Sequence, residues 1–192
     1  MEVLSVLCGT TRQLTGREVA RLVRAGSQPA VNASLRRLSE EGLVHADEAG
    51  NAYLYTLNRD HLAAPAVQLL ADIWPELLRR LRNEIAHWQI APVHLSIFGS
   101  AARGEGDTAS DIDIFVVRPR DVLDDDPRWR EQLDDLSDHV LAWTGNHVGL
   151  SEVSERDVRR LRRERPPVVG ELSRDAISIA GSEPAELFGG RR

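Results

Sequence analysis

Over the first 60 residues, apolar positions recur at helical spacing and then alternate along two short runs. The apolar residues within 2–8 predict a first helix. The stretch Thr15-Gly16-Arg17-Glu18 is a capping box, which predicts the start of a second helix. Ser27 can cap a third helix, and Gly42 ends it. The alternating runs on either side of Gly50-Asn51 predict a β-hairpin.

Residues 63–90 continue with apolar positions every three or four residues, which predicts a long helical connector with a kink at Pro75. An apolar stripe of this length can pack against a second domain of the same chain. It can equally pack against another copy of the chain, so the pattern leaves a homodimer open.

Residues 91–180 alternate between strand-like and helix-like patterns, and we expect a second domain there. The pattern ends in a short helix and an edge strand, and we read residues 181–192 as a terminal turn and frayed tail. The fold class is therefore α+β or α/β, with domains at 1–62 and 91–180 joined by the connector at 63–90. The expected elements of the second domain are strands at 93–98, 111–117 and 147–153 and helices at 127–144 and 155–165.

Composition is typical of a globular protein, with 42% hydrophobic and 28% charged residues. No apolar run reaches the roughly 20 residues that span a bilayer, and no cationic leader precedes the first apolar stretch. With Cys8 as the single cysteine, we expect a cytoplasmic protein without membrane contact.

The net charge of −6 lies in residues 91–192, and all 24 basic residues are Arg. Overall acidity argues against non-specific coating of nucleic acid. The basic helix at 155–165 can bind nucleic acid, pair with the acidic stretch 124–126, or be solvated, and we favour the last two readings.

Two aspartates, Asp111 and Asp113, stand one residue apart at the start of an apolar strand. Side chains alternate across a strand, so both carboxylates point to one face. Like charges at that distance repel unless a cation lies between them. Oxygen ligands with room for water and phosphate suit Mg²⁺ or Mn²⁺.

Gly99 and Ser100 turn the chain out of the preceding apolar strand and into a short helix that ends with Arg103. Glycine permits close approach of a phosphate to the backbone, the serine hydroxyl can donate, and Arg103 adds charged donors. A phosphate-binding turn that faces a metal site is the equipment for nucleotidyl transfer.

The stretch GSAARGEGDTASDIDIFVV resembles the signature of the DNA polymerase β nucleotidyltransferase superfamily, in its small bacterial minimal form. The resemblance covers about residues 91–180 and implies a mixed sheet flanked by helices. It implies that a nucleoside triphosphate binds at Gly99, Ser100, Arg103 and Ser110, and that Asp111 and Asp113 hold Mg²⁺ as the catalytic carboxylates. The matching positions are Gly99, Ser100, Ala102, Arg103, Gly104, Ser110, Asp111, Ile112, Asp113 and Ile114.

Active members of that family carry a third carboxylate on a later strand, and here Gly149 stands in its place. Glu152 falls on the opposite face of a regular strand. His147 shares the face of Gly149 and is either a ligand or base or, as we favour, a packing residue. The chain is therefore either a working transferase or a regulator with a degenerate, nucleotide-sensing domain. A third reading is an antitoxin-like protein that modifies or sequesters a protein partner, often a HEPN-type RNase.

Helix, helix, helix and hairpin over residues 1–62 resemble the winged helix-turn-helix family, whose recurring pattern is met from Leu14 to Val44. The resemblance implies that the third helix enters the major groove of operator DNA. Gln28, Asn32 and Arg36 then lie on its exposed face, where Gln and Asn suit adenine and Arg suits guanine or phosphate. The alternative is a scaffold or dimerisation domain, since this region has no net charge.

Overall fold

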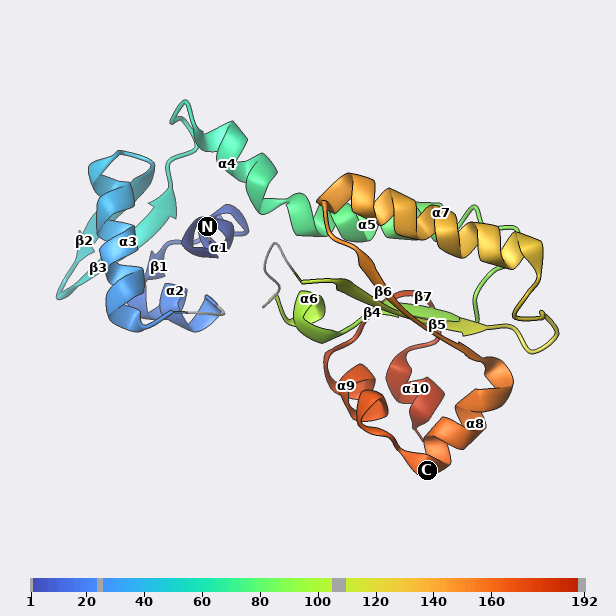
Figure 1. Ribbon diagram of the computed structural model, residues 1–192. Coiled ribbons are helices and arrows are strands. Elements are labelled where there is room, and N and C mark those ends of the chain that lie inside the picture. Colours follow the sequence, from blue (N-terminus) through green and yellow to red (C-terminus); the bar gives the residue numbers. More distant parts are fainter. Residues whose placement is uncertain (1, 24–25, 105–109, 190–192) are drawn as a thin grey trace. The chain divides into compact units, whose positions relative to one another are not determined.

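The computed structural model describes residues 2–23, 26–104 and 110–189, which form two compact units (Figure 1). The first unit comprises residues 1–76 and the second residues 77–192. Across those described ranges, no helix combines the length and the apolar character that crossing a membrane requires.

In its described part, the first unit contains three helices and then a hairpin, followed by a further helix. The strands form an antiparallel sheet in the order β1-β3-β2. Leu7, Leu14, Val19 and Leu35 are almost completely buried and form the centre of its core. The elements are α1 (Glu2–Cys8), β1 (Leu14–Thr15), α2 (Gly16–Leu22), α3 (Gln28–Glu40), β2 (Val44–Ala49), β3 (Ala52–Leu57) and α4 (Ala64–Ala71).

The predicted capping box is present at the start of α2. The hydroxyl of Thr15 accepts the backbone N–H of Glu18 at 3.2 Å, and the Glu18 carboxylate accepts the backbone N–H of Thr15 at 2.8 Å. Ser27 caps α3 in the same way, by accepting the N–H of Ala30. Both helix starts were readable because the groups that bond are only three residues apart.

The predicted connector is two helices rather than one. Helix α4 ends at Ala71 and α5 (Ile73–Ile85) begins after Asp72. Pro75 lies in the first turn of α5, where its missing N–H costs no hydrogen bond, and the chain departs from helix at Asp72, three residues before the expected kink. Val67 on α4 packs against the core of the first unit, whereas Leu81 on α5 is buried in the second.

Among the described residues, four strands of the second unit form a mixed sheet in the order β6-β5-β4-β7. Strands β5 and β6 are parallel, and β4 is antiparallel to both of its neighbours. The predicted mixed sheet and edge strand are both confirmed. Besides α5, the elements are β4 (His94–Ile97), α6 (Gly99–Arg103), β5 (Ile112–Arg118), α7 (Pro127–Thr144), β6 (Val148–Ser154), α8 (Glu155–Glu164), α9 (Pro167–Asp175), β7 (Ile177–Gly181) and α10 (Pro184–Phe188).

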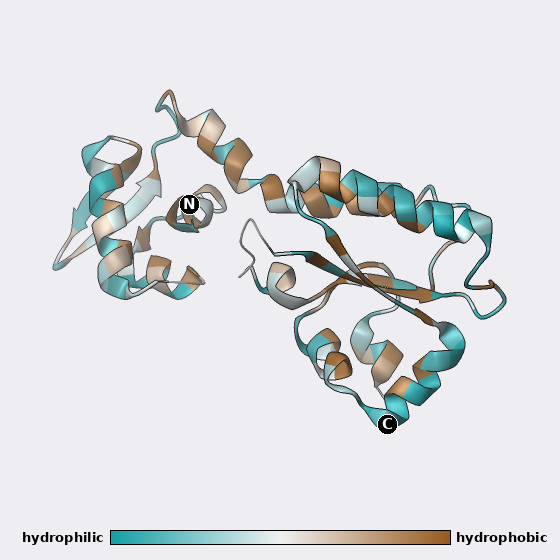
Figure 2. Ribbon diagram, viewed as in Figure 1, coloured by the Kyte–Doolittle hydropathy of each residue, from teal (hydrophilic) through white to brown (hydrophobic). Residues whose placement is uncertain are grey.

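Helices cover both faces of this sheet (Figure 1). Helices α5 and α7 lie on one face, and α6, α8, α9 and α10 lie on the other. Phe115 and Val117 of β5 point toward the second group and pack with a cluster of apolar residues on α8, α9 and α10. In Figure 2 the strands are brown between the two helical layers, as expected for a sheet buried on both faces.

Part of the C-terminal segment is a helix, where a terminal turn and a frayed tail were predicted. Residues 184–188 form α10, and Phe188 is only 3% exposed in the core beside Phe115. The prediction of a tail is therefore wrong for this segment, while residues 190–192 lie outside the described ranges.

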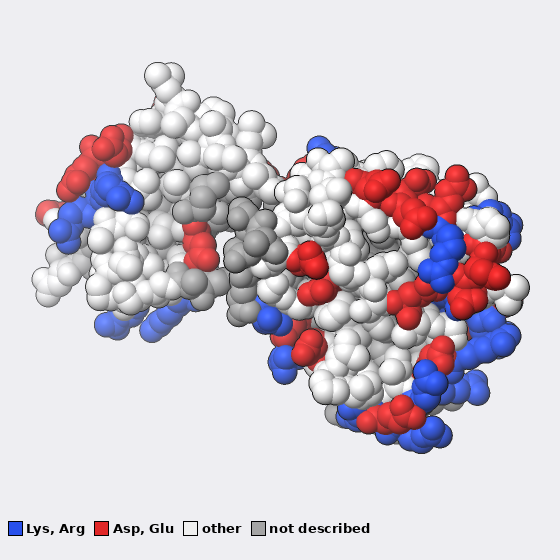
Figure 3. Space-filling view, viewed as in Figure 1, with Lys and Arg blue, Asp and Glu red and all other residues white. Residues whose placement is uncertain are grey.

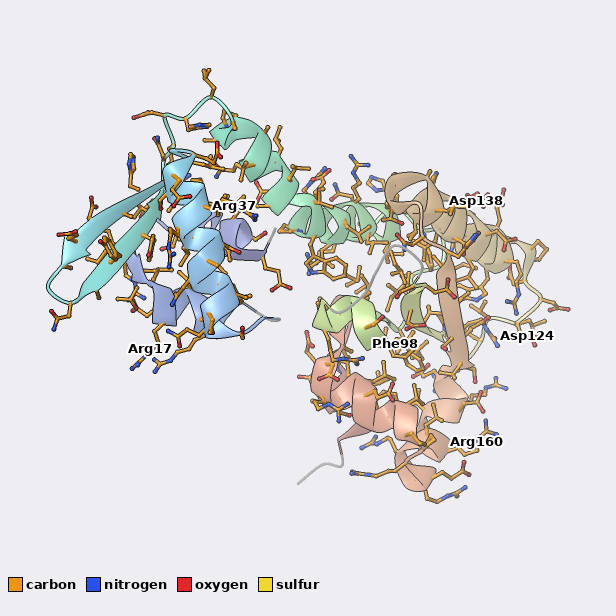
Figure 4. All side chains as sticks on the ribbon, turned by 60° about the vertical axis from the view of Figure 1, so that its left-hand side comes forward. Arg17, Arg37, Phe98, Asp124, Asp138 and Arg160 are labelled. Carbon is orange, nitrogen blue, oxygen red and sulfur yellow. The ribbon has the colours of Figure 1, made fainter. Side chains whose placement is uncertain are left out.

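Arginine side chains gather over α8 at one side of the second unit (Figure 3). Acidic side chains on the same helix neutralise part of this charge, because Arg160 pairs with Asp157 at 3.1 Å and Arg163 with Glu164 at 3.5 Å. In Figure 4, Arg160 extends from α8 and is more than half exposed. Asp126 of the acidic stretch pairs with Arg128 instead, at 2.8 Å.

Candidate active site

The pairing of β4 with β5 brings Gly99 against Asp113. Ile97 pairs with Ile114 across the two strands, and the backbone N–H of Phe98 donates to the carbonyl oxygen of Asp113 at 3.0 Å. Gly99 has a φ of +69°, and a β-carbon at this position would lie 2.4 Å from Asp113 Oδ2. Backbone conformation and space both require glycine here, so the turn passes directly beside a carboxylate.

Asp111 and Asp113 converge on Gly149. Asp113 is the partner of Gly149 in the parallel pairing of β5 with β6. A β-carbon at Gly149 would lie 2.7 Å from Asp113 Oδ1 and 3.8 Å from the β-carbon of Asp111. The two carboxylate side chains therefore lie close to each other, at the end of the sheet where β5 and β6 begin.

Asp113 is half-buried beside other charged groups, and this changes its acidity. Burial raises the pKa of Asp113, and the negative charges of Asp111 and Glu171 raise it further. The positive charge of Arg103 acts in the opposite direction. A cation bound between the two aspartates would relieve the same repulsion, so the electrostatics of the site favour one.

The other predicted nucleotide-binding residues surround this point. Ser100 follows Gly99 in α6, which has five residues, so the helix dipole is small and any phosphate contact depends on the backbone and hydroxyl groups. Arg103 lies 3.6 Å from Asp175 of α9. Ser110 precedes Asp111, and its carbonyl oxygen accepts from Asn146 Nδ2 at 2.9 Å. Asp107, a carboxylate four residues after Arg103 in the sequence, lies outside the described residues.

Gly149 occupies the position of the expected third carboxylate. Glu152 does not replace it, and His147 as a ligand or base stays a prediction. Glu152 belongs to the opposite face of β6, where its carboxylate accepts from Arg118 Nε at 2.7 Å, Trp129 Nε1 at 3.0 Å and Arg130 at 2.9 Å. His147 precedes β6 and is exposed, so the prediction of a packing histidine is wrong.

The two aspartates fit a divalent cation that keeps other ligands. Within the described ranges, no three side chains of His, Cys, Asp or Glu form a metal-binding group. Mg²⁺ is commonly held by one or two carboxylates while water and phosphate oxygens complete its shell. Asp111 and Asp113 match that pattern, with the phosphates of a nucleotide as the remaining ligands.

Two acidic residues of α9 near the site, Glu171 and Asp175, were not predicted from the sequence. They stand four residues apart on a short helix, which indicates a shared helix face. Nothing in the sequence connects that face with Asp113, because more than 50 residues separate them along the chain.

In the first unit, Gln28, Asn32 and Arg36 all line a groove of about 1180 Å³ between α3 and the β2–β3 hairpin. Asn32 also packs on α2, because its Oδ1 atom lies 2.4 Å from where a β-carbon of Gly16 would stand. Arg37 belongs to a separate hollow with residues of α1, on the side of α3 away from the hairpin (Figure 4).

Comparison with protein families finds a match within the second unit. Residues 78–164 match the nucleotidyltransferase domain family. The matched range includes the Gly99 turn, both aspartates and Gly149, and it ends before α9. The residues that form the candidate site, apart from those of α9, thus lie within the range that is similar to this family.

Two solved structures are similar to this chain, each at 18% sequence identity over 58% of its length. One is a toxin–antitoxin crystal structure with AMP-PNP, of which 80% is covered at a TM-score of 0.39. The other is a mutant of the toxin–antitoxin MntA-HpeT with aspartate-to-glutamate changes, of which 79% is covered at a TM-score of 0.40. No curated protein matches the chain.

Proposed function

We propose that the second unit transfers a nucleoside monophosphate from a nucleoside triphosphate to an acceptor hydroxyl, with Mg²⁺ or Mn²⁺ bound. The observation that supports this most is the convergence of Asp111 and Asp113 on Gly149, beside the Gly99 turn. This arrangement lies inside the range that matches the nucleotidyltransferase domain family.

Each residue has a role in the proposed reaction. Asp111 and Asp113 hold the cation, and the backbone at Gly99 and the Ser100 hydroxyl donate to phosphate oxygens, with Ser110 near the same point. Arg103 holds α9 through Asp175 and reduces the negative charge of the site. The cation, when bound, neutralises charge on the phosphates and on the leaving pyrophosphate.

The bonds change in one displacement at the α-phosphorus. The acceptor oxygen forms a bond to that phosphorus, and the bond between the phosphorus and the oxygen bridging to the β-phosphate breaks. Pyrophosphate leaves with the electron pair, and the acceptor proton passes to a base.

Calorimetry and pyrophosphate release test this function. We expect the protein to bind a non-hydrolysable nucleoside triphosphate in the presence of Mn²⁺, and Asp111→Asn and Asp113→Asn to abolish binding. Asp138→Asn changes an exposed aspartate of α7 and is the matched control. Binding with pyrophosphate release supports transfer, whereas binding without release from any nucleoside triphosphate indicates a nucleotide sensor. Absence of binding would refute both.

The groove in the first unit favours a second function, sequence-specific binding of DNA by a winged helix-turn-helix domain. Gln28, Asn32 and Arg36 line the groove together with Arg17, Tyr53 and other residues of the hairpin. Arg17, which is labelled in Figure 4, lies in the first turn of α2 and lines the same groove. Polar side chains with an arginine on one helix are what base and phosphate contacts require.

Selection of bound duplexes from a random pool, followed by fluorescence anisotropy, tests this second function. We expect Arg36→Ala to weaken binding to the selected duplex about tenfold or more, because one good base or phosphate contact contributes about 1–3 kcal/mol. Arg37→Ala is the control, since Arg37 lines a different hollow of the same helix. If no duplex is selected and the unit instead self-associates, the scaffold or dimerisation reading holds.

A further inference from the structure

Helix α9 covers the face of the sheet to which Asp113 points. Residues alternate along β5, so Asp113 shares a face with Phe115 and Val117. Those two residues pack with Val169 and Leu172 of α9, which are 5% and 1% exposed. The buried residues fix α9 over the carboxylate side of the sheet.

An ion pair ties α9 to the phosphate-binding turn. Arg103 ends α6, the helix that begins at Gly99, and its guanidinium lies 3.6 Å from the carboxylate of Asp175. Glu171 precedes Asp175 by one helical turn and therefore lies on the same side of α9. The face of α9 that meets α6 thus carries Glu171 as well, and its side chain is half-buried.

The packing of α9 on β5 and its ion pair with Arg103 place Glu171 on the Asp113 side of the sheet. Among the causes that raise the pKa of Asp113, Glu171 follows burial and Asp111. No carboxylate of β6 reaches the site, because Gly149 has no side chain and Glu152 is held on the opposite face by Arg118, Trp129 and Arg130. Glu171 is therefore an additional carboxylate on the Asp113 side, supplied by a helix instead of a strand.

We propose that Glu171 is the base of the transfer reaction, taking the place of the third carboxylate that β6 lacks. This inference rests on the proposed function. The Glu171 carboxylate accepts the proton of the acceptor hydroxyl as the acceptor oxygen bonds to the α-phosphorus and pyrophosphate leaves. Glu171 acts on the acceptor and not on the cation, in agreement with the absence of a three-residue metal group among the described residues.

Separate measurements of nucleotidyl transfer and of nucleotide binding test whether Glu171 is the base. The probe is ATP labelled at the α-phosphate, with Mn²⁺ and with water, the protein itself and a cell extract as acceptors. We expect Glu171→Gln to reduce total transfer about 10²-fold or more, as loss of a general base does, while the affinity for the Mn²⁺–nucleotide complex stays unchanged. Glu171→Asp keeps a carboxylate and should retain part of the rate. Glu164→Gln, on exposed α8, is the control.

The position of Glu171 can be tested without turnover. In protein labelled with ¹³C at the glutamate carboxylates, bound Mn²⁺ broadens signals of nearby carbons, and Glu171→Gln identifies the signal of Glu171. We expect that signal to broaden at Mn²⁺ concentrations that leave Glu164 sharp. Binding of the nucleotide with a sharp Glu171 signal, or full transfer by Glu171→Gln, overturns the inference alone. Failure of the wild-type protein to bind or to transfer overturns the proposed function and the base together.

Discussion

Gly99 and Asp113 are in a contact that no other residue at position 99 could make. The Asp113 carboxylate fills the space of a β-carbon at Gly99, and the backbone there is left-handed. Glycine at position 99 is therefore needed both for the turn and for the placement of the Asp113 carboxylate.

Gly99→Ala should therefore displace Asp113. We expect a loss of about 1–2 kcal/mol of stability from the left-handed backbone, and a loss of about tenfold or more in affinity for Mn²⁺ and nucleotide. Gly145→Ala is a matched control, because Gly145 has a φ of +77° and no atom within 4 Å of its β-carbon position. Equal binding by the two variants would show that the contact with Asp113 does not matter. Urea unfolding and calorimetry provide the measurements.

Gly149→Ala should weaken metal binding with little loss of stability. The new β-carbon meets the end of the Asp113 side chain at 2.7 Å, and a carboxylate can rotate away at low cost to the fold. Gly170→Ala in α9 is the control. Its new β-carbon has no atom within 4 Å, and replacing a helical glycine should stabilise the protein by about 0.5–1 kcal/mol. A Gly149→Ala protein with unchanged Mn²⁺ affinity would contradict the convergence of both aspartates at this position.

Much of this site could be predicted from the sequence, and the distance between residues along the chain explains why. Gly99 follows β4, and Asp111 and Asp113 lie at the start of β5, the next strand, so strand alternation and the short connection already place them together. Gly149 could be recognised as a departure because the resemblance to the superfamily leads to a carboxylate at this position of the third strand.

Other features depend on tertiary contacts that leave no local signal. Glu171 and Asp175 belong to α9, which packs on β5, and Asp175 meets Arg103 from a distant part of the chain. The break at Asp72 was missed because the apolar spacing continues through it, although α4 and α5 pack against different cores. Phe188 was missed because a short glycine-flanked segment resembles a tail until the pocket that receives it is known.

Glu152→Ala should destabilise the second unit and leave nucleotide binding intact. The substitution removes the acceptor for Arg118 and Trp129, whose side chains are largely buried. Unpaired donors of this kind cost about 2–4 kcal/mol in total. Urea unfolding monitored by tryptophan fluorescence measures the loss, and calorimetry measures the binding. Loss of binding in a folded variant would assign Glu152 to the site instead.

The stability of the second unit should fall in acid because of His94, which is completely buried in β4. Its Nδ1 donates to the Ser182 carbonyl oxygen at 2.6 Å, and its Nε2 accepts from the Ser96 hydroxyl at 2.9 Å, as a neutral ring does. Burial lowers the pKa of His94 below its ordinary value of about 6.5.

Because the folded state binds the proton less readily, the contribution of His94 is complete above about pH 6.5 and is lost as the pH falls through the lowered pKa. Urea unfolding at pH 7.5 and 5.0 should show a larger loss for the wild type than for His94→Gln. Identical losses in both proteins would assign the acid sensitivity to other groups.

The order of strands in the second sheet affects how this chain behaves when it is shortened. Strand β7 is the last strand along the sequence, yet it covers the free edge of β4, near the middle of the chain. A protein that stops after α9 would keep Asp111 and Asp113 and leave a hydrophobic strand with unpaired backbone groups, which is a template for aggregation. Truncation from the C-terminus should therefore yield insoluble protein even though the candidate site is still present.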